Sequence, residues 1–379
     1  MLKLLKWLDE NILQILSLVL IIFIPLYPKI PFAEIIPGYI VRVRIDDFLI
    51  SFAILIWVIW LFRGKINLKE NPLFIPILLY VAIGFLSSIS AIIWTKTVPL
   101  QELHVSKLFL HFLRRIEYFS VFFIFFSSIK SINQLKKYVF LILVTFLAVS
   151  IYGFGQKYVY WPAFSTMNRE FSKGVYLYLS ENARVLSTFG GHYDLAAYDM
   201  MLLSLSVPLM LLVRKFRLKF IFFIISLFGF WLLILTVSRT SFIAYLAAIT
   251  VAFGFILVKK GFLWTLPRWL AVILISLAIM LFSGTLSSRF SHVLKIDTSY
   301  IQKLVLSPFK NIKPPSGQNV AFLDVGSESD IPPSTKKPGS DDNESTKPAD
   351  VDGDIPDGLI PGKDGRGADL SRCHLHVFG

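Results

Sequence analysis

Long apolar segments, separated by short polar connections, dominate the chain. A helix needs about 20 predominantly apolar residues to cross the hydrocarbon core of a bilayer. The apolar runs therefore predict an all-α, polytopic membrane protein with about nine transmembrane helices. We expect the spans at about residues 11–28, 46–62, 72–94, 113–129, 138–155, 193–213, 218–237, 240–258 and 267–284.

The composition supports the same class of protein. Of the 379 residues, 55% are hydrophobic and 15% are aromatic, whereas soluble domains are about 45–50% apolar. The formal net charge of +13 is spread over short connections, which is typical of membrane topology signals and not of a nucleic-acid site. The single Cys373 excludes an intrachain disulfide framework and a thiolate metal cluster. We expect a lipid bilayer as partner, with no nucleic acid, no metal and no other cofactor.

Four short connections carry most of the basic residues. Short basic connections lie on the cytoplasmic side of a membrane, which predicts a cytoplasmic N-terminus. Residues 156–192, the Ser238–Arg239 connection and everything after about residue 285 then face the extracytoplasmic side. The first apolar segment lacks a signal-peptide cleavage pattern, so we expect it to remain as a span. The basic residues are Arg63, Lys65, Lys69, Lys130, Lys136, Lys137, Arg214, Lys215, Arg217, Lys219, Lys259, Lys260 and Arg268.

The segment 103–115 has a different pattern. His104 and His111 lie seven residues apart, hence on one helical face, among aromatic and aliphatic residues. This pattern predicts an amphipathic helix in the membrane interface, just before the fourth span. Two histidines two turns apart provide too few ligands for a metal site.

The C-terminal part differs in composition from the rest. Residues 1–284 form the expected transmembrane domain, and residues 285–313 the start of a large extracytoplasmic loop. Residues 314–379 are rich in Pro, Ser, Gly and Asp, a composition that cannot bury a core and predicts a disordered tail. The aspartates of this tail lack the spacing of a calcium-binding loop.

Arg239 is the most informative polar residue, because it lies in TVSRTSF between two apolar segments. A charge at the centre of a spanning helix costs about 2.5–3.5 kcal/mol on insertion scales. Ser238 is a natural N-cap for a helix that starts at about Thr240, and a helix N-terminus attracts anions. An arginine beside it adds a planar fork for two phosphate oxygens. Arg184, on the same side of the membrane, is the second candidate anion ligand.

Other polar residues on that side have a structural and a functional interpretation. Gly190 and Gly191 permit a sharp turn before the sixth span. His192 and Asp194 follow in its first turn as candidate catalytic residues; His192 either accepts a proton or is an interfacial histidine. Arg114 and Arg115 either support an anion site or form an ion-paired turn with Glu117. Arg42 and Arg44 are expected as interfacial anchors, and Asp46 or Asp47 as an N-cap.

Three segments resemble the O-antigen ligase/polymerase superfamily in the order found there. RVLSTFGGHYDLAAYDMMLLSLSVPL resembles the family segment with an arginine, a Thr-Phe pair and an Ala-x-Tyr motif before a span. TVSRTSFIAYLAAITVAFGF is similar to the family's Ser-Arg hairpin and following helix. SSRFSHVLKIDTSYIQ (287–302) resembles the start of its large external loop. The resemblance covers about residues 10–305.

The resemblance implies a GT-C-like glycosyltransferase of the bacterial inner (cytoplasmic) membrane. Such enzymes take a glycan from polyprenyl (undecaprenyl) diphosphate and join it to the hydroxyl of a glycan or lipid acceptor in surface polysaccharide biosynthesis. Arg184 and Arg239 would hold the diphosphate, without a metal. Ligase, polymerase and protein glycosylation all remain open.

The chain departs from the family pattern after about residue 284. Family members place the catalytic base on a histidine late in the external loop, before further spans, whereas no apolar span follows here. His292, His374 and His376 do not match that motif, so no base is assigned to them. A truncated, inactive member is therefore one alternative. Another is a transporter or flippase of lipid-linked oligosaccharide, which would show internal repeats and charges at several depths.

Overall fold

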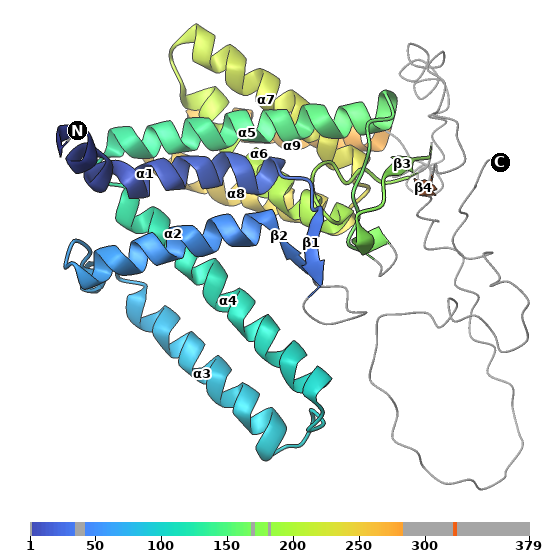
Figure 1. The fold of residues 1–379 in the computed structure, drawn as a ribbon. Helices are drawn as coiled ribbons and strands as arrows, with labels where there is room; N and C mark the ends of the chain where they lie inside the picture. Colours follow the sequence, from blue (N-terminus) through green and yellow to red (C-terminus); the bar gives the residue numbers. More distant parts are fainter. Residues whose placement is uncertain (1, 35–41, 168–170, 181–182, 283–320, 324–379) are drawn as a thin grey trace, which may run out of the picture.

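The computed structural model describes residues 2–34, 42–167, 171–180, 183–282 and 321–323. Within these residues the chain forms nine long helices, so the all-α prediction is confirmed (Figure 1). Each predicted span lies on one helix, although α1, α4 and α5 begin well before the predicted starts at residues 11, 113 and 138. The helices are α1 (Leu2–Leu26), α2 (Ile45–Phe62), α3 (Phe74–Ile93), α4 (Glu102–Ser128), α5 (Ile132–Tyr158), α6 (His192–Leu212), α7 (Phe216–Leu235), α8 (Arg239–Lys260) and α9 (Phe262–Phe282).

Eight of these described helices are long and apolar enough to cross a membrane, and the chain is a multi-pass membrane protein. The ninth, α4, carries charged residues along its first half. The helix predicted at 103–115 is present, but it runs on without interruption through the segment predicted as the fourth span, which is not among the eight. The structure has one continuous helix of 27 residues, because no Gly or Pro interrupts the segment.

The helices pack as a bundle around α5, α6, α7 and α8. Phe146 of α5, Leu203 of α6 and Tyr245 of α8 are fully buried in its core. Gly229 of α7 lets that helix approach α5, since a Cβ there would lie 2.4 Å from the Phe146 ring. Helix α1 packs against α5, α2 and α4, whereas α3 packs mainly against α4 and extends away from the bundle (Figure 1).

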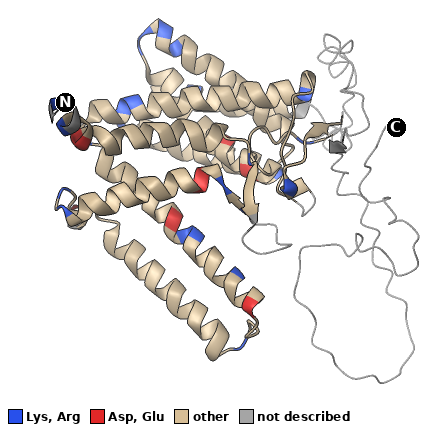
Figure 2. Cartoon of the chain, in the orientation of Figure 1, with Lys and Arg blue, Asp and Glu red and all other residues tan. Residues whose placement is uncertain are grey.

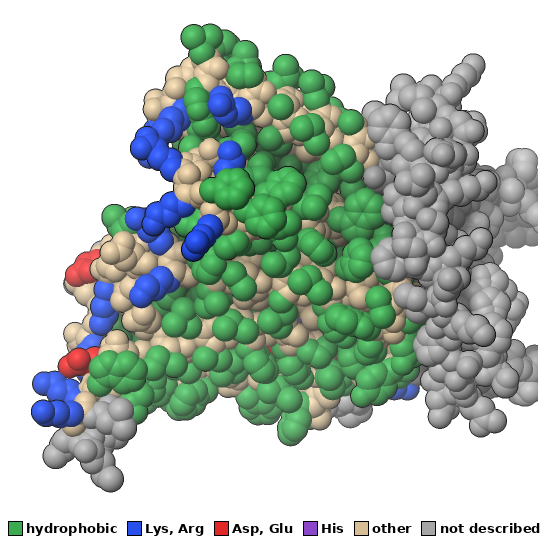
Figure 3. Space-filling view, turned by 90° about the horizontal axis from the view of Figure 1, so that it is seen from above, with side chains coloured by type: hydrophobic (Ala, Val, Ile, Leu, Met, Phe, Trp, Pro, Cys, Tyr) green, Lys and Arg blue, Asp and Glu red, His purple; other side chains and the backbone are tan. Residues whose placement is uncertain are grey.

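The two ends of the bundle differ in charge. One end, which we call the basic end, carries the N-terminus and the α2–α3, α4–α5, α6–α7 and α8–α9 connections (Figure 2). Lys and Arg side chains gather there, and hydrophobic side chains cover much of the surface beyond them (Figure 3). At this end Arg63 and Lys65 pair with Asp9, and Lys65 and Lys130 lie over the Trp60 ring.

The opposite end, which we call the loop end, carries the polar segments singled out in the sequence. It contains a hairpin of β1 (Pro31–Glu34) and β2 (Arg42–Arg44), the α5–α6 connection and the α7–α8 turn. Strand β3 (Leu177–Leu179) of the α5–α6 connection pairs in parallel with β4 (Ala321–Leu323). Strand β4 lies within the segment 314–379 for which the sequence predicts a disordered tail. The rest of that tail and residues 285–313 lie outside the described residues.

Candidate functional site

The turn between α7 and α8 presents Arg239 at the N-terminus of a helix. Helix α8 begins at Arg239, and the Ser238 side chain accepts a hydrogen bond from the Ser241 amide, so the predicted N-cap is confirmed. Ser238 is buried, whereas Arg239 and Thr240 are exposed. Among the described residues Arg239 forms neither a hydrogen bond nor an ion pair. Its guanidinium is therefore available beside the positive end of the α8 dipole.

Val237 holds this turn in an unusual conformation. Its φ is +55°, in the left-handed region, and its amide donates to Ile234 O at 3.0 Å. A left-handed conformation costs an L-residue about 1–2 kcal/mol, and a β-branched residue adopts it rarely. Backbone strain of this kind persists only where the surroundings enforce it, and it is concentrated at functional sites.

Arg184 lies in the α5–α6 connection, where its neighbours are buried and the backbone is held by side-chain hydrogen bonds. Its neighbours Ala183, Val185 and Leu186 are at most 2% exposed. The Gln156 side chain, fully buried at the end of α5, accepts from the Ser187 amide at 2.7 Å and donates to Ser187 O at 2.8 Å. Gln156 thus binds both the amide and the carbonyl group of Ser187, and these bonds hold the backbone three residues after Arg184 in place.

A single backbone hydrogen bond connects the two arginine segments. The Val185 amide donates to Leu235 O, the last residue of α7, at 3.2 Å. Arg184 immediately precedes Val185 in the α5–α6 connection. Ser238 and Arg239 follow Leu235 by three and four residues, in the α7–α8 turn. The structure therefore brings the predicted anion ligands to the same end of the bundle. We call Arg184, His192, Ser238, Arg239 and Thr240 the arginine site.

His192 contacts Arg184 directly. It is the first residue of α6 and 1% exposed, and its Nε2 lies 2.9 Å from Arg184 Nη1. A guanidinium only donates hydrogen bonds, so Nε2 must be the acceptor and the proton of the neutral ring is assigned to Nδ1. Protonation of Nε2 would break this bond and place two cations in contact. The geometry favours a histidine that positions Arg184 over one that accepts a proton from substrate.

Asp194, the second weak catalytic candidate, is exposed in the first turn of α6. In the part of the chain that the structure describes, it forms no ion pair with either arginine of the site. An acidic residue in the first turn of a helix is favourable in the field of the helix dipole. This local role explains Asp194 without catalysis.

A backbone contact links the segment before α6 to the lining of a neighbouring cavity. The Thr166 amide donates to Gly190 O at 2.8 Å. A Cβ on Gly190 would lie 2.2 Å from Thr166 Oγ1, so only glycine fits there. Thr166 lines the cavity on the other side of this contact. The predicted turn at Gly190–Gly191 is present just before His192, which is not among the described residues that line the cavity.

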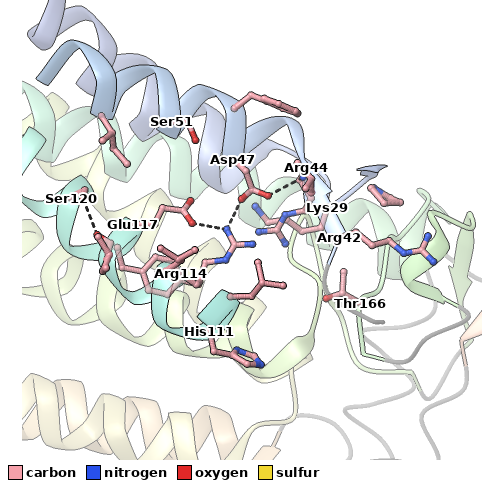
Figure 4. A pocket seen from close by; sticks show the side chains of 18 of the residues that line it. Lys29, Arg42, Arg44, Asp47, Ser51, His111, Arg114, Glu117, Ser120 and Thr166 are labelled. Atoms are coloured by element: carbon pink, nitrogen blue, oxygen red, sulfur yellow. Dashed lines mark hydrogen bonds and ion pairs between the residues drawn. The ribbon is translucent and has the colours of Figure 1, made fainter. Parts of the chain in front are cut away.

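The cavity has a volume of about 730 Å³ and lies between α2, α4, the β1–β2 hairpin and the α5–α6 connection (Figure 4). We call it the hairpin cavity. Its walls are apolar along the two helices, with Phe48, Ile54 and Leu113 among the lining residues. Its charged lining residues are Lys29, Arg42, Arg44, Asp47, Arg114 and Glu117.

Carboxylates hold most of the cations of the hairpin cavity. Arg114 Nη1 donates to both Asp47 and Glu117 (Figure 4). The predicted ion-paired turn is therefore confirmed for Arg114 and Glu117. Arg115, expected to act with Arg114, instead donates to the Tyr80 hydroxyl of α3 at 3.1 Å and does not line the cavity. The two neighbouring arginines therefore have different surroundings.

The hairpin side of the cavity corrects the predicted N-cap of α2. The N-cap of α2 is Arg44, and neither aspartate; Asp47, three residues on, accepts from the Arg44 amide at 2.9 Å. Asp46 is 3% exposed and pairs with Lys29 and Arg44, both at 3.1 Å. Burial lowers the pKa of the Lys29 ammonium, and the charge of Asp46 opposes that shift. Arg44 is thus a cavity residue, and more than an interfacial anchor.

Three residues without a predicted role, Gln156, Lys157 and Asp199, lie near the loop end. Gln156 and Lys157 end an apolar span, which was the only signal for them; Lys157 Nζ donates to Ala183 O at 3.1 Å. Asp199 lies two turns below His192 on α6 and is fully buried. Neither of its carboxylate oxygens has a hydrogen-bond partner among the described residues. An acidic residue within a spanning helix is a candidate functional residue by default.

Comparisons of the chain with models of protein families, with curated proteins and with solved structures found no match.

Proposed function

We propose that the chain is a membrane glycosyltransferase that transfers a glycan from a polyprenyl-diphosphate carrier to an acceptor hydroxyl. The observation that carries the proposal is the arginine site: Arg184 and Arg239 lie at one end of a membrane bundle, and neither pairs with a carboxylate in the described residues. The motif resemblance of these two segments to the O-antigen ligase/polymerase superfamily supports the same substrate class. In this proposal the loop end faces the extracytoplasmic side.

Charge development in the reaction explains why two guanidinium groups are useful. The acceptor oxygen forms a bond to C1 of the donor sugar, and the bond between C1 and the diphosphate oxygen breaks. The electron pair of that bond stays on the diphosphate, and the acceptor proton passes to a base outside the arginine site. Fixed guanidinium groups stabilise the growing negative charge of the leaving group, and do so more strongly than in water. No metal ion is required for this step.

Each residue of the site has a separate task in this mechanism. Arg239 and the first amides of α8 bind one part of the diphosphate, with Ser238 fixing the helix N-terminus and Thr240 adding a hydroxyl. Arg184 binds the other part, in an orientation set by His192. Because His192 is neutral, it holds Arg184 without cancelling its charge.

A transporter or flippase of lipid-linked oligosaccharide is the second candidate function. It would bind the same diphosphate and would also need polar groups through the depth of the bundle. Asp199 is the observation that favours it, since this carboxyl group lies buried within α6. The arginines of the arginine site lie at one end only, which favours the transferase.

Release of the polyprenyl diphosphate carrier in vitro tests the proposal. The full chain is reconstituted with an undecaprenyl-diphosphate oligosaccharide and a glycan or lipid acceptor, with and without EDTA. We expect carrier release to be unaffected by EDTA and to fall by about 10²–10³-fold in Arg184→Ala and Arg239→Ala, as for loss of one transition-state donor. Arg239→Lys should also be impaired, because an ammonium lacks the planar fork.

Arg115→Ala is the matched control, since that arginine is bound to Tyr80 outside the arginine site. Its rate should equal that of the wild type. Full activity of Arg239→Ala would refute the assignment of the diphosphate. Donor movement across the membrane without glycosidic bond formation would favour the flippase.

A further inference from the structure

The hairpin cavity combines an apolar cleft with a charged rim. Phe48, Ser51 and Ile54 line it from one face of α2 over about 9 Å of helix. Residues of α4 from 110 to 120 line it from the other side over about 15 Å. The cleft thus follows two helices away from the loop end. Phe48 and Leu113 are 54% and 57% exposed, so large apolar surfaces lie open there.

Opposite charges alternate along the rim. Lys29 and Arg44 pair with Asp46, and Arg114 pairs with Asp47 and Glu117. Because a carboxylate accompanies each of these cations, the rim suits a singly charged anion better than a diphosphate. The arginine site, whose two guanidinium groups have no carboxylate partner among the described residues, complements a more highly charged anion.

Arg44 and Glu117 retain unused hydrogen-bonding groups. Only Nε of the Arg44 guanidinium is engaged, by Asp46, and its two terminal nitrogens have no acceptor within the described chain. Those two groups form the fork that binds phosphate oxygens in pairs. Oε1 of Glu117 is buried and without a partner among the described residues. It is an acceptor that a hydroxyl group would satisfy.

We propose that the hairpin cavity binds a phospholipid whose headgroup is a singly charged phosphodiester bearing hydroxyl groups, as in phosphatidylglycerol. The Arg44 fork holds the phosphodiester, Glu117 accepts a headgroup hydroxyl, and an acyl chain lies between α2 and α4. Figure 4 shows Arg44, Ser51 and Glu117 among the side chains around this cavity. Because the described lining of the cavity contains no residue of the arginine site, we assign this lipid to a site distinct from that of the glycan carrier. The inference does not depend on the proposed function.

Native mass spectrometry of the full chain tests the proposal. The protein is delipidated and exposed to equal amounts of dioleoylphosphatidylglycerol and a diglucosyl diacylglycerol, which has hydroxyls but no phosphate. Wild-type protein should retain one phosphatidylglycerol in preference to the glycolipid. Arg44→Gln, which loses the fork, should lower that occupancy about tenfold, the value of roughly one charge-assisted hydrogen bond.

A second pair of variants leaves the ion pairs intact, in case Arg44→Gln does not fold. Ser51→Trp fills the apolar cleft and should also lower occupancy, whereas Leu55→Trp, exposed on α2 outside the cavity lining, should not. Arg115→Gln is the matched control for Arg44→Gln. Equal retention of both lipids, or unchanged phosphatidylglycerol in Arg44→Gln and Ser51→Trp, would overturn the proposal.

A competition arm distinguishes the glycan carrier from a phospholipid. Undecaprenyl diphosphate is added to protein that already holds phosphatidylglycerol. Retention of both lipids supports a second, separate site. Displacement of phosphatidylglycerol that persists in an Arg184→Ala/Arg239→Ala double variant would show that the cavity is the carrier's own site, and would overturn the assignment to a phospholipid.

Discussion

Arg184 and Arg114 lie at the same end of the bundle, yet they are held in opposite ways. Arg184 bonds to the neutral ring of His192 at 2.9 Å and has no carboxylate partner in the described residues. Arg114 donates to two carboxylates, Asp47 and Glu117. Both side chains are fixed in position, but only Arg184 keeps its full charge for a ligand.

The difference separates two uses of arginine in a membrane protein. A carboxylate partner positions the guanidinium and neutralises it, which favours packing of α2 against α4. A neutral acceptor positions the guanidinium and leaves the charge in place, which favours binding of an anion. Arg239 lies at the same end, exposed at a helix N-terminus, and forms no hydrogen bond or ion pair with the described residues.

Removal of the Arg114 charge should therefore lower the stability more than removal of the Arg184 charge. In Arg114→Met, two partly buried carboxylates lose their cation, and we expect a loss of stability of about 3–5 kcal/mol. In Arg184→Met, the partner left behind is neutral, so the loss should be about 1 kcal/mol. Methionine retains the aliphatic stem of arginine, which isolates the effect of the charge. Unfolding in detergent measures both variants.

Activity should follow the reverse order. Carrier release should be lost in Arg184→Met, and should persist in whatever fraction of Arg114→Met stays folded. An Arg184→Met variant that is less stable than Arg114→Met would contradict the comparison, because it would make Arg184 the structural residue of the two.

His192 offers a smaller effect that distinguishes positioning from proton transfer. The amide oxygen of His192→Gln can accept from Arg184, whereas His192→Ala cannot. We expect carrier release about tenfold lower in His192→Ala, the value of one lost hydrogen bond to a charged group, and near the wild-type rate in His192→Gln. The pH profile should keep its shape in His192→Gln. Loss of an inflection near neutral pH together with most of the rate, in both variants, would identify His192 as a base.

The smallest effect is expected at Val237, next to Arg239. Val237→Gly removes the strain of a positive φ, worth about 1–2 kcal/mol, but makes the unfolded chain more flexible. Its stability should stay within about 1 kcal/mol of the wild type, while carrier release falls because Arg239 is less firmly positioned. Val237→Ala is the control. Because alanine still has a Cβ, it should remove less of the backbone strain than glycine does. A large loss of stability in Val237→Gly would show that the turn is not strained.

The fold was predictable from the sequence because the bilayer imposes a single strong pattern. The helix starts at His192 and Arg239 were expected to within a residue, since Gly191 and Ser238 mark them locally. The full length of helix α4 was not predicted, because its amphipathic first half resembles an interfacial helix. Nothing local in the sequence shows that this half continues into the apolar half as one helix. Strand β4 depends on pairing with β3, which lies about 140 residues away.

The candidate site was predictable only in part. Arg184 and Arg239 stood out because charges are rare beside apolar spans, and the turn at Gly190 was visible as a glycine pair. The contact of Arg184 with His192 and the hydrogen bonds between Gln156 and Ser187 depend on tertiary packing. The hairpin cavity was not predicted, because its two walls come from helices about 60 residues apart in the sequence.

Binding of prenyl phosphates tests most directly whether the arginine site holds a diphosphate. The affinities of the wild type and of an Arg184→Met/Arg239→Met variant are measured for a prenyl diphosphate and for the monophosphate of the same chain, in EDTA. We expect the wild type to prefer the diphosphate by about tenfold or more, as one further charge-assisted contact provides, and the double variant to bind both alike. An undiminished preference for the diphosphate in the double variant would contradict the account.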